Sequence, residues 1–246
     1  MKIDTDTSSP ESQSDSRAIH LNAYTSGTMD APRICCANSG HDGRKVLQPY
    51  QQAIAELIAP ESTVLDIGCG KGALLAWLRD NKNVRGRGLE IESARVAEAV
   101  ASGLSVVQGD ADGELQYYPD KVFDTVVLSL TLQVMKHPRL VLEQALRIGR
   151  KAVVVIPNFG HARNRLYLLL KGQMPVTSAL SYQWYETPNI HFCTIRDMTA
   201  LAREIGCTVE AQRYLTEAGA ARAFAGAGSL YANLFGEYGV FCLSRG

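Results

Sequence analysis

The sequence has no net charge, no long apolar run and no paired-cysteine motif, and each absence excludes a class of protein. Basic and acidic residues number 25 each, so the chain lacks the positive field of a general nucleic-acid-binding protein. No apolar stretch is long enough to cross a bilayer, and the polar, acidic N-terminus lacks the apolar core of a signal peptide. We therefore expect a cytoplasmic protein that binds neither nucleic acid nor membranes.

The six cysteines are scattered along the chain, and none belongs to a C-x-x-C pair. This spacing predicts no metal site and no disulfide framework, as is typical of a reducing compartment. Cys69 lies between two glycines, and we interpret it as a small apolar filler rather than a nucleophile.

The length of 246 residues and the 46% hydrophobic content suit one large α/β domain with an extension. Residues 1–40 are rich in Ser, Thr, Asp and Pro and show no sustained periodicity, which predicts a disordered N-terminal tail. Residues 41–246 are then expected to form the folded domain, with an insert at residues 158–191.

Short apolar runs alternate with amphipathic stretches through most of this domain. Such alternation predicts a mostly parallel sheet with helices on both of its faces. The predicted strands are 63–67, 85–91, 104–107, 123–129 and 152–156, followed by two late strands near 208–214 and 238–243. The predicted helices are 46–58, 73–79, 93–101, 138–148 and 195–205.

The most informative segment is VLDIGCGKG at residues 64–72, which reads as a buried strand broken by three glycines. A helix-like run follows, and strand, glycine turn and helix together form the entry to a nucleotide site. The turn also satisfies G-x-G-x-x-A through Ala73, so an NAD(P)-dependent oxidoreductase has to be considered. Asp66 disfavours it, since a carboxylate beside the turn would repel a pyrophosphate. The same carboxylate suits S-adenosylmethionine, which carries an ammonium and a sulfonium but no phosphate.

Further acidic residues follow the next strands. Glu90 ends the second strand about twenty residues after the glycine turn, where a carboxylate can accept both ribose hydroxyls; the alternative is a solvated strand end. Asp110 and Asp112 follow the third strand, and a carboxylate there could hold an adenine amine with backbone help from Ala111, although acidic turns after strands are common. The predicted cofactor-binding residues are Asp66, Gly68, Gly70, Glu90, Asp110, Ala111 and Ser129.

These residues at successive strand ends resemble the Rossmann-like fold of class I S-adenosylmethionine-dependent methyltransferases, over residues 45–156 and the late strands. The resemblance implies a seven-stranded sheet with an antiparallel last strand, and S-adenosylmethionine or S-adenosylhomocysteine as ligand. Many small-molecule methyltransferases of this kind carry a histidine after the fourth strand, where this chain has Gln133. Glutamine cannot exchange a proton near neutral pH, so no catalytic residue is assigned.

A more specific resemblance appears in the second half of the chain. The segments at residues 147–161, 168–177 and 182–197, including YQWYETPNIHF, resemble the methionine biosynthesis proteins of the MetW family. The likeness covers about residues 45–215. It implies a role in methionine synthesis in association with the homoserine O-acyltransferase MetX.

The insert at residues 158–191 combines a basic, leucine-rich helix with an aromatic loop. Such segments cover ligand sites or form partner surfaces, where Trp, Tyr and Arg are favoured. The alternative interpretation is that the insert has no functional surface and is only a solvated helix beside a small aromatic core. We expect Arg163, Arg165, Trp184 and Tyr185 to contribute to an interface with the acyltransferase.

Two functions therefore remain open. The first is an accessory subunit that supports homoserine O-acyltransferase. The second is an S-adenosylmethionine-dependent methyltransferase acting on a small molecule, in which positioning alone could suffice without a base.

Overall fold

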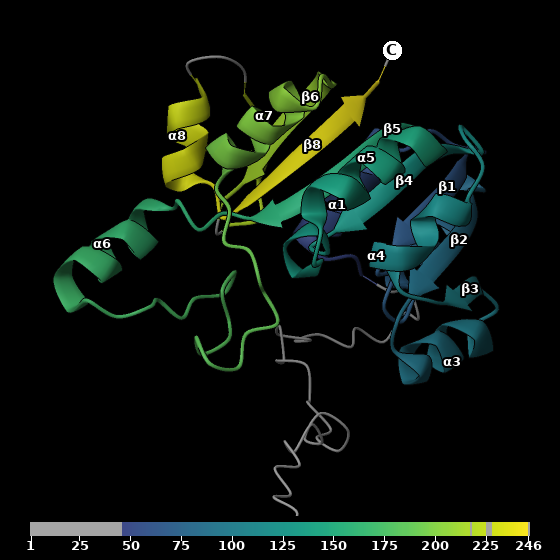
Figure 1. Ribbon diagram of the computed structural model, residues 1–246, viewed down its shortest axis with the longest axis horizontal. Helices are drawn as coiled ribbons and strands as arrows, with labels where there is room; N and C mark the ends of the chain where they lie inside the picture. Colours follow the sequence, from purple (N-terminus) through teal and green to yellow (C-terminus); the bar gives the residue numbers. More distant parts are fainter. Residues whose placement is uncertain (1–45, 217, 225–227, 246) are drawn as a thin grey trace, which may run out of the picture. The chain divides into compact units, whose positions relative to one another are not determined.

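The computed structural model describes residues 46–216, 218–224 and 228–245, and within them a single mixed sheet dominates the fold (Figure 1). The predicted tail at residues 1–40 lies outside these ranges. The described strands are β1 Thr63–Ile67, β2 Arg85–Glu90, β3 Ser105–Gln108, β4 Phe123–Ser129, β5 Gly149–Pro157, β6 Thr208–Leu215, β7 Ala221–Ala223 and β8 Tyr238–Ser244.

The strand order in the sheet is β3-β2-β1-β4-β5-β8-β6-β7. β1 to β5 run parallel to one another, whereas β8 pairs antiparallel with both β5 and β6. The antiparallel late strand is therefore confirmed. The predicted count of seven strands was wrong, because the described residues contain an eighth, β7, which pairs with β6 at the sheet edge. Its three residues are all exposed, so it carries no apolar pattern that could reveal it.

Helices follow most strands. The described helices are α1 Pro49–Leu57, α2 Ala73–Lys82, α3 Ser93–Ala101, α4 Ala111–Glu114, α5 Pro138–Ile148, α6 Ala162–Lys171, α7 Ile195–Glu204 and α8 Gly228–Phe235, with 3₁₀ turns η1 Leu115–Tyr117 and η2 Leu132–Val134. The five helices predicted from periodicity correspond to α1, α2, α3, α5 and α7. Gly206 has a φ of +71° just after α7, as expected for a glycine that ends a helix.

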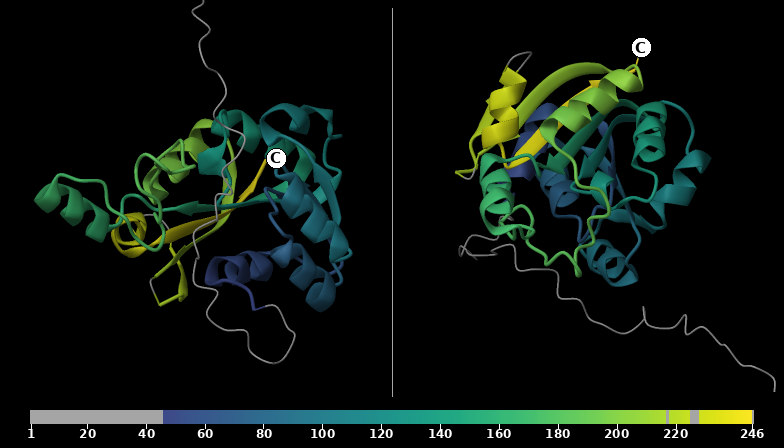
Figure 2. Two further views of the ribbon diagram at one scale, coloured as in Figure 1. Left: turned by 90° about the horizontal axis from the view of Figure 1, so that it is seen from below. Right: turned by 60° about the vertical axis from the view of Figure 1, so that its left-hand side comes forward.

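The sheet is covered on both faces, and Figure 2 shows the helices on either side of it. Val64 of β1 belongs to the apolar cluster that contains residues of α1 and α2, whereas its neighbour Leu65 belongs to the cluster that contains residues of α5 and α7. This alternation follows from strand geometry, in which successive side chains point to opposite faces. Both faces are apolar, which explains why the central strands read as nearly continuous apolar runs.

The carboxyl ends of the parallel strands lie at one edge of the sheet. The pairing register places Asp66 of β1 beside Gly88 of β2 and Val127 of β4. Glu90 ends β2 and Ser129 ends β4, so the predicted ligand-binding positions of three strands lie at this same edge.

The insert begins after β5 and is anchored by Asn158. Its buried amide nitrogen donates to the carbonyls of Asn233 and Gly236 at 2.9 and 2.7 Å. Its side-chain oxygen accepts from the N–H groups of Gly160 and Ile195 at 3.1 and 3.3 Å. The Asn158 side chain therefore ties the end of β5 to the start of α7 and the end of α8. Beyond this anchor, α6 projects away from the sheet (Figure 1).

Candidate functional site

The three glycines after β1 all have positive φ, of +71° at Gly68, +57° at Gly70 and +74° at Gly72. Their surroundings differ. A Cβ at Gly68 would lie 2.8 Å from the Thr131 side chain, and one at Gly72 would lie 2.3 Å from Leu104. A Cβ at Gly70 would meet no described atom within 4 Å. Gly68 and Gly72 therefore permit packing within the fold, while Gly70 presents bare backbone to open space, as close approach of a ligand requires.

Glu90 is only 5% exposed and is held by three backbone N–H groups. Its Oε2 accepts from Gly70 at 2.8 Å, and its Oε1 accepts from Ile91 and Glu92 at 3.0 and 3.1 Å. The alternative of a solvated strand end is therefore wrong. Because each carboxylate oxygen has more than one acceptor direction, the side chain can still bind a ligand hydroxyl.

Asp66 is 2% exposed, and its Oδ1 has no hydrogen-bond partner in the part of the chain that the structure describes. Burial and the nearby negative charge of Glu90 raise its pKa to about 7. Burial and the negative charge of Asp66 in turn raise the pKa of the Tyr50 phenol on α1. An uncompensated buried carboxylate is costly, and such groups are common where a protein binds a ligand.

Cys69 is a half-buried thiol within the glycine turn. Burial, together with the charges of Asp66 and Glu90, raises its pKa to about 12. The thiol is therefore protonated at neutral pH and is not a nucleophile. Its sulfur occupies the space that a Cβ on Gly88 would take, 2.4 Å from that position, so the interpretation as a filler is consistent with the packing.

Asp110 and Ala111 lie where β3 passes into α4. The Asp110 carboxylate caps this short helix by accepting from the Asp112 N–H at 2.9 Å, and Ala111 is buried. The sequence pattern missed the role of Asp112, whose two oxygens each accept a backbone N–H, from Lys136 and His137, at 2.9 Å. The acidic turn therefore also fixes the segment after β4, and part of its charge has a structural role.

The segment after β4 carries Ser129, which is half-buried at the strand end. Thr131, which sequence reasoning did not single out, donates to the carbonyls of Ile67 and Ser129, both at 3.0 Å. It thereby joins the ends of β1 and β4. The sequence hints at this role of Thr131 only indirectly, through Gly68. Thr131 packs against Gly68 so closely that a residue with a Cβ would not fit there.

Gln133 is buried in this segment and connects it to the insert. Its side-chain nitrogen donates to the Leu130 carbonyl at 2.7 Å, and its side-chain oxygen has no partner among the described residues. Its backbone carbonyl accepts from the N–H groups of Ile190 and His191, both at 3.0 Å. The insert is thus hydrogen-bonded directly to the loop that follows β4.

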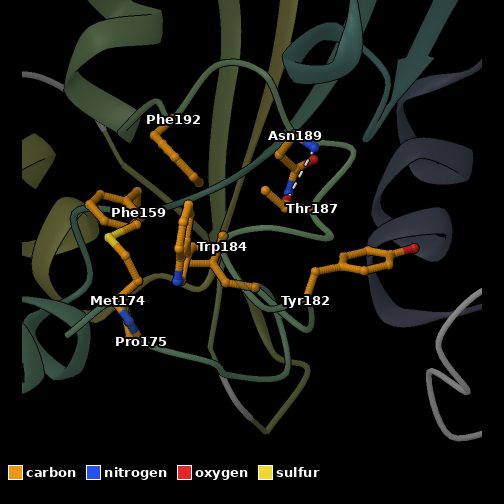
Figure 3. A pocket seen from close by; sticks show the side chains of 9 residues that line it. Phe159, Met174, Pro175, Tyr182, Trp184, Thr187, Asn189 and Phe192 are labelled. Carbon is orange, nitrogen blue, oxygen red and sulfur yellow. Dashed lines mark hydrogen bonds between the residues drawn. The ribbon is translucent and has the colours of Figure 1, made fainter. Parts of the chain in front are cut away.

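The aromatic loop of the insert lines a small pocket that is open to solvent (Figure 3). Trp184 lies beside Phe159 and Met174 there, while the Tyr182 side chain points away from them. The pocket is lined by Phe159, Met174, Pro175, Leu180, Tyr182, Trp184, Thr187, Asn189 and Phe192. Trp184 and Tyr185 pack edge to face with ring centroids 5.6 Å apart, and both are exposed. Arg163 and Arg165 are on α6, a separate part of the insert.

A family model described as methionine biosynthesis protein MetW matches residues 48–243. The chain belongs to the MetW family. A curated relative from Rhodopirellula baltica, named bifunctional methionine biosynthesis protein MetXA/MetW, is 31% identical over 169 residues. That match covers 65% of this chain and 27% of the relative, so the chain spans about a quarter of the relative's length.

Solved structures with the same fold include S-adenosylmethionine-dependent methyltransferases. One from Mesorhizobium loti is 16% identical with a TM-score of 0.59, covering 84% of this chain and 100% of that one. Another from Thermotoga maritima, described as a possible histamine N-methyltransferase, is 18% identical with a TM-score of 0.58, covering 80% and 87%. At these identities the likeness shows the fold alone. The MetW-family chain therefore has the methyltransferase-like α/β fold.

The described ranges contain neither a candidate metal site nor a candidate membrane-spanning helix. They contain no group of three or more His, Cys, Asp or Glu side chains placed to hold a metal ion. Nor is any helix in them both long and apolar enough to cross a membrane.

Proposed function

We propose that the chain binds S-adenosylmethionine or S-adenosylhomocysteine at the carboxyl ends of β1, β2, β3 and β4. The buried, unpartnered oxygen of Asp66 and the open backbone at Gly70 fit this ligand. A cationic ligand would compensate the buried negative charge, which a pyrophosphate would oppose.

Each predicted site residue has a role in this proposal. Glu90 accepts hydrogen bonds from the ribose hydroxyls while Gly70 holds its carboxylate in place. Asp66 faces the positive charge of the methionine moiety. Asp110 and the backbone at Ala111 bind the adenine end, and Gly68 and Ser129 shape the strand ends on either side of the ligand.

We further propose that the chain is an accessory subunit of a homoserine O-acyltransferase of the MetX kind. The observation that carries this proposal is the relative whose name joins MetXA and MetW in one bifunctional protein. Segments that are fused in one organism commonly act together as separate chains in another. The family membership supports the same pathway, methionine biosynthesis.

The chemistry of the site also favours an accessory role over methyl transfer. Gln133 has no titratable group, and its side-chain nitrogen is committed to the Leu130 carbonyl. The Cys69 thiol is protonated, because its pKa is raised to about 12. Neither side chain can accept a proton from a methyl acceptor near neutral pH.

Methyl transfer to a small molecule is the second candidate. The aromatic side chains that line the open pocket in the insert favour it, because they offer an apolar contact surface to an acceptor. When bound, S-adenosylmethionine supplies an electrophilic methyl group, and the chain's own contribution would be positioning and exclusion of water.

Acyltransferase assays with purified components separate the two functions. Homoserine acylation by the host's MetX-type enzyme, followed as release of free coenzyme A, is expected to rise when this chain is added. Equal activity with and without the chain would contradict the accessory role. Production of S-adenosylhomocysteine in extracts depleted of the acyltransferase would instead support methyl transfer.

A further inference from the structure

The leucines of α6 have little to pack against in the described structure. Asn164 is the only buried residue of this ten-residue helix. Leu169 and Leu170 are 80% and 70% exposed, and Leu166, one turn earlier, is also exposed. Spacing of three and four residues places these leucines on one side of the helix.

The neighbouring helix α8 carries exposed apolar residues of its own. Leu230, Tyr231 and Phe235 of α8 are exposed, and the ring centroids of Tyr231 and Phe235 lie 4.5 Å apart. Asn158 holds the start of the insert against α8 through the Asn233 and Gly236 carbonyls. α6 and α8 lie on the same side of the molecule in both panels of Figure 2, with α6 extending further from the sheet. We call these six residues, Leu166, Leu169, Leu170, Leu230, Tyr231 and Phe235, the α6–α8 surface.

A surface of this kind is unfavourable in water. A helix of ten residues is only marginally stable alone, and most helical stability comes from packing of its apolar side. Exposed apolar residues gathered on adjoining helices mark an interaction surface rather than ordinary scatter.

The charge around the surface indicates what covers it. α6 carries Arg163, Arg165 and Lys171 and no acidic residue, and α8 has no charged residue at all. A second copy packed antiparallel on α6 would bring Arg165 of one chain near Lys171 of the other, with no acidic side chain on either helix to compensate. A protein partner with apolar side chains and an acidic rim complements the surface better.

We propose that the α6–α8 surface is the docking site for the acyltransferase subunit, through an apolar patch bordered by Asp or Glu side chains. This inference rests on the proposed accessory function and specifies where the contact forms. The relative from Rhodopirellula baltica supports this choice of partner, because its name gives MetXA and MetW as one bifunctional protein.

The test is binding of the full chain to the purified host acyltransferase, measured by calorimetry. The double variant Leu169→Asp/Leu170→Asp is expected to weaken binding by about 10- to 100-fold, as central apolar contacts do. Leu140→Asp, at an exposed leucine on α5, is the matched control and should bind like the wild type. Lys171→Glu should weaken binding most at low salt, because screening removes the attraction at high salt. Both charge-introducing leucine variants replace exposed residues, and circular dichroism checks that they remain folded.

The outcomes separate this inference from the proposed function. If the wild-type chain does not bind the acyltransferase, the accessory role fails and this inference fails with it. If the wild type binds and the double variant binds equally well, only the docking site is wrong. Sedimentation showing a dimer that the double variant abolishes would assign the surface to a second copy. Binding to phosphatidylcholine–phosphatidylglycerol vesicles that the double variant abolishes would assign it to a membrane, and would overturn the proposal too.

Discussion

The Glu90 carboxylate accepts a hydrogen bond from the Gly70 N–H at 2.8 Å, across twenty residues of sequence. The contact joins the end of β2 to the glycine turn after β1. It holds the acidic group beside the one glycine of the turn that faces open space. The residue proposed to bind the ribose and the backbone proposed to contact the ligand are therefore fixed relative to each other before any ligand arrives, which lowers the ordering cost of binding.

Replacing Glu90 with Ala should weaken S-adenosylhomocysteine binding by about 1–3 kcal/mol, because polar ligand groups would be left unpaired. Titration calorimetry measures the loss. Glu92→Ala is the control, since the Glu92 side chain is exposed and pairs with Arg95 at 2.6 Å on the neighbouring turn. Unchanged affinity in Glu90→Ala would remove the ribose assignment.

Gly70→Ala should reduce ligand affinity beyond its effect on stability. The left-handed conformation costs an L residue about 1–2 kcal/mol, and the new methyl group would occupy the space open to a ligand. Gly172→Ala is the matched control for Gly70→Ala. Gly172 has a φ of +63°, and a Cβ added there would likewise meet no described atom within 4 Å. Both variants should lose similar stability in urea unfolding, and only Gly70→Ala should lose affinity. Equal ligand affinities in the two variants would contradict a close approach at Gly70.

The raised pKa of Asp66, about 7 against an ordinary value of 3.8, predicts a pH dependence of stability. Between these values the folded state binds a proton that the unfolded state has released, so the free energy of unfolding should fall as the pH rises from about 4 to 7. The groups facing this carboxyl are Tyr50, Cys69 and Glu90. Asp66→Asn should flatten the profile and give higher stability than the wild type at pH 8, where the wild-type carboxylate is charged.

Urea unfolding at pH 5 and pH 8 measures this difference. Asp124→Asn is the control, because hydrogen bonds from Thr63 lower the pKa of Asp124, so that group stays ionised across the interval and the slope should not change. S-adenosylmethionine affinity should increase with pH through 7 in the wild type, as the carboxylate that attracts the cationic ligand forms. A wild-type stability profile as flat as that of Asp66→Asn would exclude a buried, proton-binding carboxyl.

Trp184→Ala should lower activation of the acyltransferase while leaving ligand affinity nearly unchanged. Trp184 is exposed on the insert, and the insert is joined to the loop after β4 through the Gln133 carbonyl. If ligand binding alters that loop, ligand and partner affinities must be coupled reciprocally. Acylation assays with and without S-adenosylmethionine measure the coupling, with Leu140→Ala as control. If activation does not depend on S-adenosylmethionine, the accessory role stands, but ligand binding does not regulate the acyltransferase.

Local sequence patterns were sufficient to predict the strands and helices of the parallel part of the sheet, from β1 to β5. The alternation from β1 to β5 is visible because its central strands are buried on both faces, so burial appears directly as an apolar run. β7 could not be found in this way, since its side chains are exposed and its pairing with β6 depends on backbone hydrogen bonds. The acidic residues at the strand ends were predictable because parallel strands bring their carboxyl ends to one edge.

The amino-acid sequence was sufficient to predict a ligand site after β1, because the glycines, Asp66 and Glu90 are close to strand ends that periodicity locates. The packing of the elements was needed to show that Gly70 alone of the three glycines is open, that Asp66 has an oxygen without a partner among the described residues, and that Gln133 holds the insert. It also decided that the leucines of α6 are exposed, whereas periodicity showed only that they share a helix. Periodicity records which residues are apolar along one element. Burial and hydrogen bonding depend on partners far away in the chain, and those partners are set when the elements pack together.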